Sequence, residues 1–183
     1  RASWRRHTAL PAQRPHSFRN GTCGMKSILT RYRPAIAIAI LVILYTVGLV
    51  GLHTGSRAWF LAATPLTLVI SATLLVWNHR DWNVAAVLAM SSCAILGYGV
   101  EVVGVHTGWP FGNYAYGPTL GLKLWDVPLV IGLNWLLLAY TTGTLWARLQ
   151  APKVLQAAGA AATMTLLDWL IEPVAMRLDF WQW

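Results

Sequence analysis

The residues best able to do chemistry in this chain are its few acids. Only six Asp or Glu occur among 183 residues. Asp81 falls between two predicted helices, but Glu101 directly follows a long apolar stretch, and Asp168 and Glu172 fall within another. Asp168 and Glu172 are four positions apart, which places both carboxyls on one face of a helix. These three carboxyls are our candidates for acid–base catalysis.

Carboxyl groups inside a membrane are expensive. An ionised carboxylate at the centre of a spanning helix costs about 2.5–3.5 kcal/mol on insertion scales. The apolar stretches contain no Lys or Arg to pair with the three acids. Burial and mutual repulsion favour the protonated form, so we expect at least one carboxyl to keep its proton at neutral pH and to serve as a proton donor. The alternative is that the acids only join helices through hydrogen bonds.

The connection from residue 106 to residue 126 is rich in aromatic and turn residues, with four Gly and two Pro. We predict that it forms a lid over the mouth of a helix bundle, above the acids. Gly97, Glu101 and Gly104 share one helical face, so the glycines could leave space beside the carboxyl for an elongated apolar substrate. Helix packing explains the same spacing equally well. Asp126, at the end of the connection, is a surface acid of uncertain role.

Five apolar stretches must position these residues. Each is close to the 20 or so residues that cross a hydrocarbon core of about 30 Å. They comprise residues 34–56, 58–79, 82–100, 127–147 and 154–175. The sequence therefore predicts an all-α fold, a polytopic membrane helix bundle of about five spanning helices, with the lid between the third and the fourth. Residues 34–183 would form this catalytic bundle.

The composition supports a membrane protein. The chain is 56% hydrophobic and 11% charged, with a mean hydropathy of +0.51, whereas soluble domains carry about 25% charged residues. The net charge of +8 comes from residues 1–33, which hold eight Lys or Arg and no acid. We interpret residues 1–33 as a basic leader, and residues 1–24 as a transit peptide or an upstream extension. We expect no nucleic-acid partner, and a chain truncated at its C-terminal end.

The basic residues also predict the orientation. With a cytoplasmic N-terminus, that side carries eleven Lys or Arg and the other side three, as the positive-inside rule requires. Most tryptophans, Trp181 and Trp183 included, then fall at helix ends, where we interpret them as interfacial anchors. Trp135 and Trp169 lie deeper. The scattered His and Cys residues have no metal-ligand spacing, so we expect no metal site.

A string of Gly, acidic and aromatic positions resembles the integral-membrane carotenoid hydratase family, which includes carotenoid 1',2'-hydratases and bisanhydrobacterioruberin hydratases. The string is Gly97-x-x-x-Glu101-x-x-Gly104-x-x-Thr107-Gly108-x-x-Phe111-Gly112-x-Tyr114-x-Tyr116, followed by Val127-Pro128, Trp135, Asp168-x-x-x-Glu172-Pro173-x-Ala175 and Trp181-x-Trp183. The resemblance covers about residues 95–183. The first two predicted helices match only in hydropathy.

The resemblance implies hydration of the terminal C1',2' double bond of an acyclic carotenoid in a prokaryotic cytoplasmic membrane, without a cofactor. A neutral carboxyl would protonate the alkene, and water would capture the tertiary cation. Asp168 is the deepest acid and our expected donor; Glu172 would hold the water, and Glu101 would complete the cluster. The expected substrate-binding residues are Gly97, Gly104, Thr107, Phe111, Tyr114, Tyr116, Trp135 and Trp169. Other membrane enzymes of carotenoid synthesis are possible partners.

Two other functions remain open from the sequence. A membrane lycopene cyclase would use the same acid but exclude water, and its product would keep the mass of the substrate. A proton-coupled transporter would also carry acids in its membrane helices. A transporter should show internal repeats and broken helices near the midplane, and the sequence shows neither.

Overall fold

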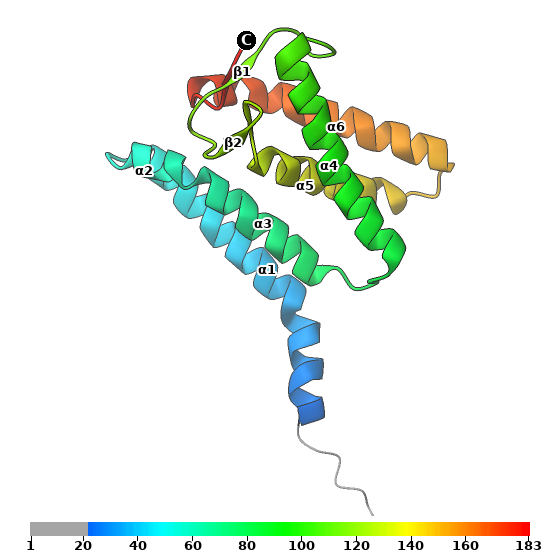
Figure 1. Cartoon of the computed structure of the whole chain (residues 1–183). Helices are drawn as coiled ribbons and strands as arrows, with labels where there is room; N and C mark the ends of the chain where they lie inside the picture. The colour runs from blue at the N-terminus through cyan, green and yellow to red at the C-terminus, as the bar shows by residue number, and fades with distance from the viewer. Residues whose placement is uncertain (1–21) are drawn as a thin grey trace, which may run out of the picture. The chain divides into compact units, whose positions relative to one another are not determined.

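The computed structural model of the chain describes residues 22–183, with side chains from Thr30 onward. Most of the predicted basic leader lies outside the described residues. Residues 34–183 form one compact unit, which contains the helix bundle (Figure 1). The elements in chain order are α1 (Thr22–Leu52), α2 (Arg57–Ala62), α3 (Thr64–Asn78), α4 (Val84–Thr107), β1 (Ala115–Tyr116), β2 (Lys123–Leu124), β3 (Val127–Pro128), α5 (Val130–Ala147), α6 (Lys153–Arg177) and β4 (Trp181–Gln182).

The predicted all-α membrane bundle is confirmed, with one correction to the number of long helices. Within the described residues, four helical segments are long and apolar enough to cross a membrane. They are Thr30–Leu52, Val84–Thr107, Val130–Ala147 and Lys153–Arg177. The second predicted span is divided instead into α2 and α3. Pro65 lies in the first turn of α3, where its missing N–H is harmless. Inside a continuous helix its ring would clash with the preceding turn.

Helix α5 is the centre of the bundle, since it packs against α3, α4 and α6. Its N-terminal half contributes Ile131 to a core that also contains Leu120 and the fully buried Val127. Leu120 and Val127 both belong to the segment that connects α4 to α5. This segment therefore packs on the helix ends as part of the fold, as expected of a lid.

Two short antiparallel pairings organise the lid. Strand β1 pairs with β4, with Tyr116 opposite Trp181, so the lid is joined to the segment that follows α6. Strands β2 and β3 form a hairpin in which Leu124 lies opposite Val127. Trp125 and Asp126 make its two-residue turn with φ values of 48° and 62°. Positive φ at both turn residues matches the right-handed twist of the strands. This backbone conformation is unfavourable for residues other than glycine.

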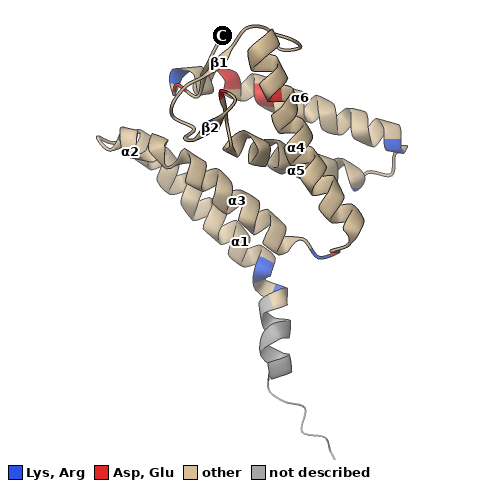
Figure 2. Cartoon of the chain, in the orientation of Figure 1, with Lys and Arg blue, Asp and Glu red and all other residues tan. Residues whose placement is uncertain are grey.

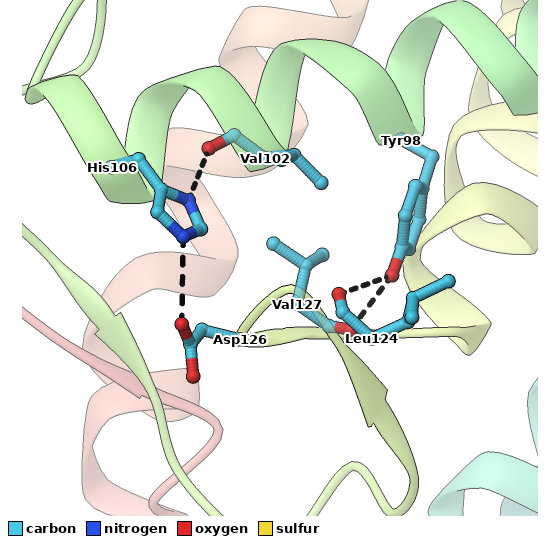
Figure 3. Close-up of polar contacts among 6 residues, drawn as sticks. All are labelled: Tyr98, Val102, His106, Leu124, Asp126 and Val127. Carbon is cyan, nitrogen blue, oxygen red and sulfur yellow. Dashed lines mark hydrogen bonds and ion pairs between the residues drawn. The ribbon is translucent and has the colours of Figure 1, made fainter.

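Contacts from α4 hold this unfavourable turn in place (Figure 3). The hydroxyl of Tyr98 donates to the carbonyl oxygens of Leu124, at 2.7 Å, and Val127, at 2.9 Å. About two turns farther along the helix, Nε2 of His106 lies 3.5 Å from the carboxylate of Asp126. Because exposed ion pairs contribute little to stability, the shorter contacts of the Tyr98 hydroxyl are the stronger constraint on the hairpin.

The contact between α4 and α5 leads to a test with a matched control. A Cβ added at Gly97 would overlap the ring of Trp135, whereas a Cβ at Gly99 would meet nothing within 4 Å. We predict that Gly97→Ala lowers the free energy of unfolding by about 1–3 kcal/mol through overpacking. Gly99→Ala should leave stability unchanged or raise it by up to about 1 kcal/mol, because alanine favours the helix. Thermal unfolding in detergent measures both. Equal midpoints for the two variants would contradict the packing.

Candidate functional site

The three candidate acids line one cavity. It has a volume of about 630 Å³ and lies between α4, α5, α6, the lid and the segment that contains β4. Glu101 enters it from α4, and Asp168 and Glu172 enter it from α6. Figure 2 shows that the acids of α4 and α6 gather toward the end of the bundle where the short strands lie. A cavity of this size is typical of sites for small organic ligands.

Glu101 is surrounded by hydrogen-bond donors. Its Oε2 atom accepts hydrogen bonds from the hydroxyls of Tyr114, at 2.6 Å, and Tyr116, at 2.8 Å. Its Oε1 atom accepts a bond of 3.1 Å from Nε1 of Trp135. Tyr and Trp side chains can donate in this way without bringing a positive charge. Hydrogen bonds to a carboxylate are stronger than those between neutral groups, so three neutral donors replace the missing cation.

The two glycines beside Glu101 have a different role from the predicted one. We expected Gly97 and Gly104 to leave open space for substrate, but aromatic side chains fill that space. The ring of Trp135 lies against Gly97, and a Cβ at Gly104 would lie 2.6 Å from the hydroxyl oxygen of Tyr114. Neither glycine lines the cavity. The absent side chains let the donors of Trp135 and Tyr114 reach the carboxylate.

Thr107 also lies outside the cavity lining. Its hydroxyl donates to the carbonyl oxygen of Val103, at 2.7 Å, and accepts a bond of 3.1 Å from the backbone N–H of Trp109. These contacts close the end of α4, where Gly108 turns the chain with φ of 73°. Thr107 therefore helps to fix the direction in which the chain leaves α4 and enters the lid.

Glu172 receives two indole donors. Nε1 of Trp181 lies 2.9 Å from its Oε1 atom, and Nε1 of Trp183 donates to the same oxygen. Alternate residues of an extended segment point to the same side, which brings both indoles to one carboxylate. We interpreted these tryptophans as interfacial anchors, and the structure gives them this further role. The spacing of two residues just after an acidic helix was the signal available in the sequence.

Asp168 differs from the other two acids. It lines the same cavity and is close enough to interact electrostatically with both Glu101 and Glu172. Among residues 30–183, no group donates a hydrogen bond to its carboxyl, and none of the basic residues there forms an ion pair with it. Trp169, the next residue, also lines the cavity and is 72% exposed. The most poorly stabilised charge of the cluster therefore belongs to Asp168.

The lid contributes an aromatic wall. Phe111, Tyr114 and Tyr116 line the cavity, and the ring of Tyr114 lies 5.0 Å from that of Trp183 between centroids. Burial, together with the neighbouring Glu101 carboxylate, raises the pKa of both Tyr114 and Tyr116 above 10. Both phenols thus keep their protons and remain donors to Glu101.

Several lining residues were not predicted from the sequence. Asn134 and Thr165 add polar groups to the cavity, and Leu138, Ala161 and Met164 add apolar walls. Asn134, an amide in an apolar helix, was the only one with a detectable signal. The others have side chains typical of any membrane helix.

Asp126 lies apart from this cluster. It is not among the cavity-lining residues, and its partner His106 lies in the last turn of α4 (Figure 3); both side chains of the pair are exposed. Within the described residues, no group of three or more His, Cys, Asp or Glu is placed to hold a metal ion.

Comparison with known proteins agrees with this arrangement. The sequence profile of the carotenoid biosynthesis protein family matches residues 58–183, which include every residue of the cavity. The chain is 34% identical over 99 residues to bisanhydrobacterioruberin hydratase of Haloarcula japonica. The aligned part covers 51% of this chain and 34% of that relative, so the chain spans about a third of the relative's length. No solved structure shows a significant match.

The Glu101 cluster predicts a specific dependence of stability on pH. The pKa of Tyr114 and Tyr116 is higher in the folded protein than the value of 10 for a free side chain. Their contribution to stability is therefore complete below pH 10 and decreases as the pH rises above it. We predict that the unfolding midpoint in detergent falls between about pH 9 and pH 11, and less steeply in the double variant Tyr114→Phe, Tyr116→Phe. Parallel curves for the two proteins would contradict this coupling.

Proposed function

The chain belongs to the carotenoid biosynthesis protein family, and from this membership and the geometry of the cavity we propose that it is a carotenoid hydratase. The proposed reaction adds water to the terminal C1',2' double bond of an acyclic carotenoid and yields a tertiary alcohol. The observation that carries the proposal is that Asp168, which has no hydrogen-bond donor among the described residues, shares the cavity with two carboxylates that have donors. This arrangement suits a proton donor in an apolar site.

Asp168 is the proposed acid. Hydrogen bonds from neutral donors stabilise the charges of Glu101 and Glu172, and those charges in turn favour a proton on Asp168. The Asp168 proton moves to C2' of the substrate, the π bond breaks, and the positive charge appears at C1', which carries two methyl groups. Because a tertiary cation is the best stabilised, protonation at C2' fixes the position of the later hydroxyl.

Aromatic rings that line the cavity would stabilise the cation. Tyr116, Trp135 and Trp169 present rings to the cavity, and the faces of such rings attract cations by about 0.5–2 kcal/mol. The nearby carboxylate charges act in the same direction. These contacts are stronger in the transition state than with the neutral polyene, as catalysis requires.

Glu172 is the proposed site for water. Its Oε1 atom is occupied by the two indoles, and the structure describes no donor to Oε2. Water held there would attack C1' with its oxygen, and Glu172 would take the released proton. Transfer of that proton back to Asp168 restores the resting state, so the net change is the addition of one water molecule. Asn134 and Thr165 are further polar groups for that water.

The role of Asp168 is testable with a conservative variant. Asp168→Asn keeps the shape of the side chain but cannot deliver an acidic proton, so we predict a loss of hydration of about 10²–10⁴-fold. The measurement is the mass of pigments made by the full-length protein in a lycopene-producing bacterium, with the amount of membrane protein quantified. Asp126→Asn is the matched control and should remain active.

Other outcomes of the pigment assay would change the proposal. Near-normal hydration by Asp168→Asn together with an inactive Glu101→Gln would move the donor to α4. A cyclised product with the mass of the substrate would replace the hydratase with a cyclase. Hydroxylated carotenoid from all three amide variants would refute acid catalysis by this cluster.

We also propose that the protein lies in a prokaryotic cytoplasmic membrane with its N-terminus inside. With α2 and α3 together making the crossing between α1 and α4, the lid would face away from the cytoplasm and the α5–α6 connection would face it. This orientation follows from the excess of Lys and Arg before Pro34 and in the connections that would share its side.

Cysteine labelling tests the orientation. In a variant without Cys23 and Cys93, a cysteine at Leu122, which is 82% exposed in the lid, should react with an impermeant thiol reagent added to intact cells. A cysteine at Leu149, which is 50% exposed beyond α5, should react only after the cells are opened. The reverse pattern would overturn the orientation. Gly117 is unsuitable, because a side chain there would collide with the backbone of Asp179.

A further inference from the structure

The cavity extends well beyond the three acids. On α5 it is lined by Ile131, Asn134, Trp135 and Leu138, a helical stripe of about 10 Å. On α6 the lining extends from Glu172 back to Ala161, a distance of about 16 Å. The site is therefore a groove along two helices that run in opposite directions.

The chemistry of the groove changes along its length. At one end are the carboxyls of Asp168 and Glu172, with the indoles of Trp181 and Trp183. At the other end, Leu138, Ala161 and Met164 provide hydrocarbon surface. No charged residue lines that end. A ligand that fits both ends has a reacting group at one terminus and a long apolar chain behind it.

At the reactive end, protein covers the groove on the lid side, where β1 pairs with β4 and Trp183 lies against Tyr114. On α6, Asp168 and Trp169 remain exposed. A long substrate whose end group reacts beside Asp168 cannot pass through the lid, so it extends along α6 toward the apolar end. Ala161 is at the limit of the lining and is itself exposed. Its side chain, a single methyl group, is the smallest of those that line this end of the groove.

We propose that the apolar end of this groove is the path by which the polyene leaves the site for the lipid, and that Ala161 sets its width. This inference rests on the proposed function. A polyene that crosses a hydrocarbon core of about 30 Å exceeds the 16 Å or so of the groove, so only the terminal part of the substrate is enclosed. The site would select substrates by one end group and by a chain slim enough to pass Ala161.

The test compares neighbouring alanines. The full-length protein is reconstituted in phosphatidylcholine vesicles containing lycopene, and the rate of hydration is followed by product mass. Ala161→Val and Ala161→Phe should lower kcat/KM progressively, by about tenfold or more for Phe, since added groups in an apolar pocket have effects of this order. Ala162→Phe is the matched control. Ala162 is exposed on α6 but does not line the cavity, and its variant should stay within about twofold of the wild type.

Binding gives a second measurement that does not depend on turnover. A cysteine at position 161, in the background without Cys23 and Cys93, should be protected by lycopene from a lipid-soluble thiol reagent. A cysteine at position 162 should not be protected. Unchanged kcat/KM for Ala161→Phe, or equal labelling of both cysteines with and without lycopene, would overturn the proposed path. Protection of the cysteine at position 161 by lycopene, together with wild-type protein that produces no alcohol, would instead refute the hydratase function and leave the binding groove supported.

Discussion

Among the described residues, the acids of the cavity have no cation as an ion-pair partner, and this is the constraint on which the rest of the structure depends. A carboxylate in a membrane helix needs compensation for lost hydration, and no Lys or Arg of the described residues pairs with Glu101, Asp168 or Glu172. The chain supplies neutral O–H and N–H donors instead. Five of them serve two carboxylates: Tyr114, Tyr116 and Trp135 for Glu101, and Trp181 and Trp183 for Glu172. Aromatic donors have the further advantage that their rings present apolar surface to a hydrocarbon ligand.

This requirement explains features that would otherwise look unrelated. Gly97 and Gly104 are needed because large donors must approach α4 closely. The β1–β4 pairing is needed because it places Tyr116 and Trp181, which serve different carboxylates, opposite each other. Tyr98 holds the neighbouring hairpin, whose turn has an unfavourable backbone conformation. The lid therefore supplies two of the donors to Glu101 and, through the β1–β4 pairing, holds the segment whose indoles serve Glu172, as well as covering one side of the cavity.

Much of the architecture could be predicted from the sequence, because hydrophobic length and charge-free stretches are local properties. The helices that carry the acids were predicted in this way, and the spacing of Asp168 and Glu172 correctly placed both on the cavity face of α6. The division of the second span at Pro65 was missed because hydropathy does not register a lost N–H. The indole donors to Glu172 were missed because they depend on the strand after α6 returning over the helix end. Such tertiary contacts leave little trace in one sequence.

Stabilising only two of the three acids has a consequence for catalysis. If Asp168 also had donors, its charged form would be favoured and it would lose its ability to protonate an alkene. If Glu101 and Glu172 had none, the proton would be shared among three similar groups, and no single carboxyl would reliably face the substrate as the acid. Two well-stabilised carboxylates beside a third without donors remove this ambiguity. The asymmetry of hydrogen bonding, more than the number of acids, is therefore what makes the cluster suitable for directed proton transfer.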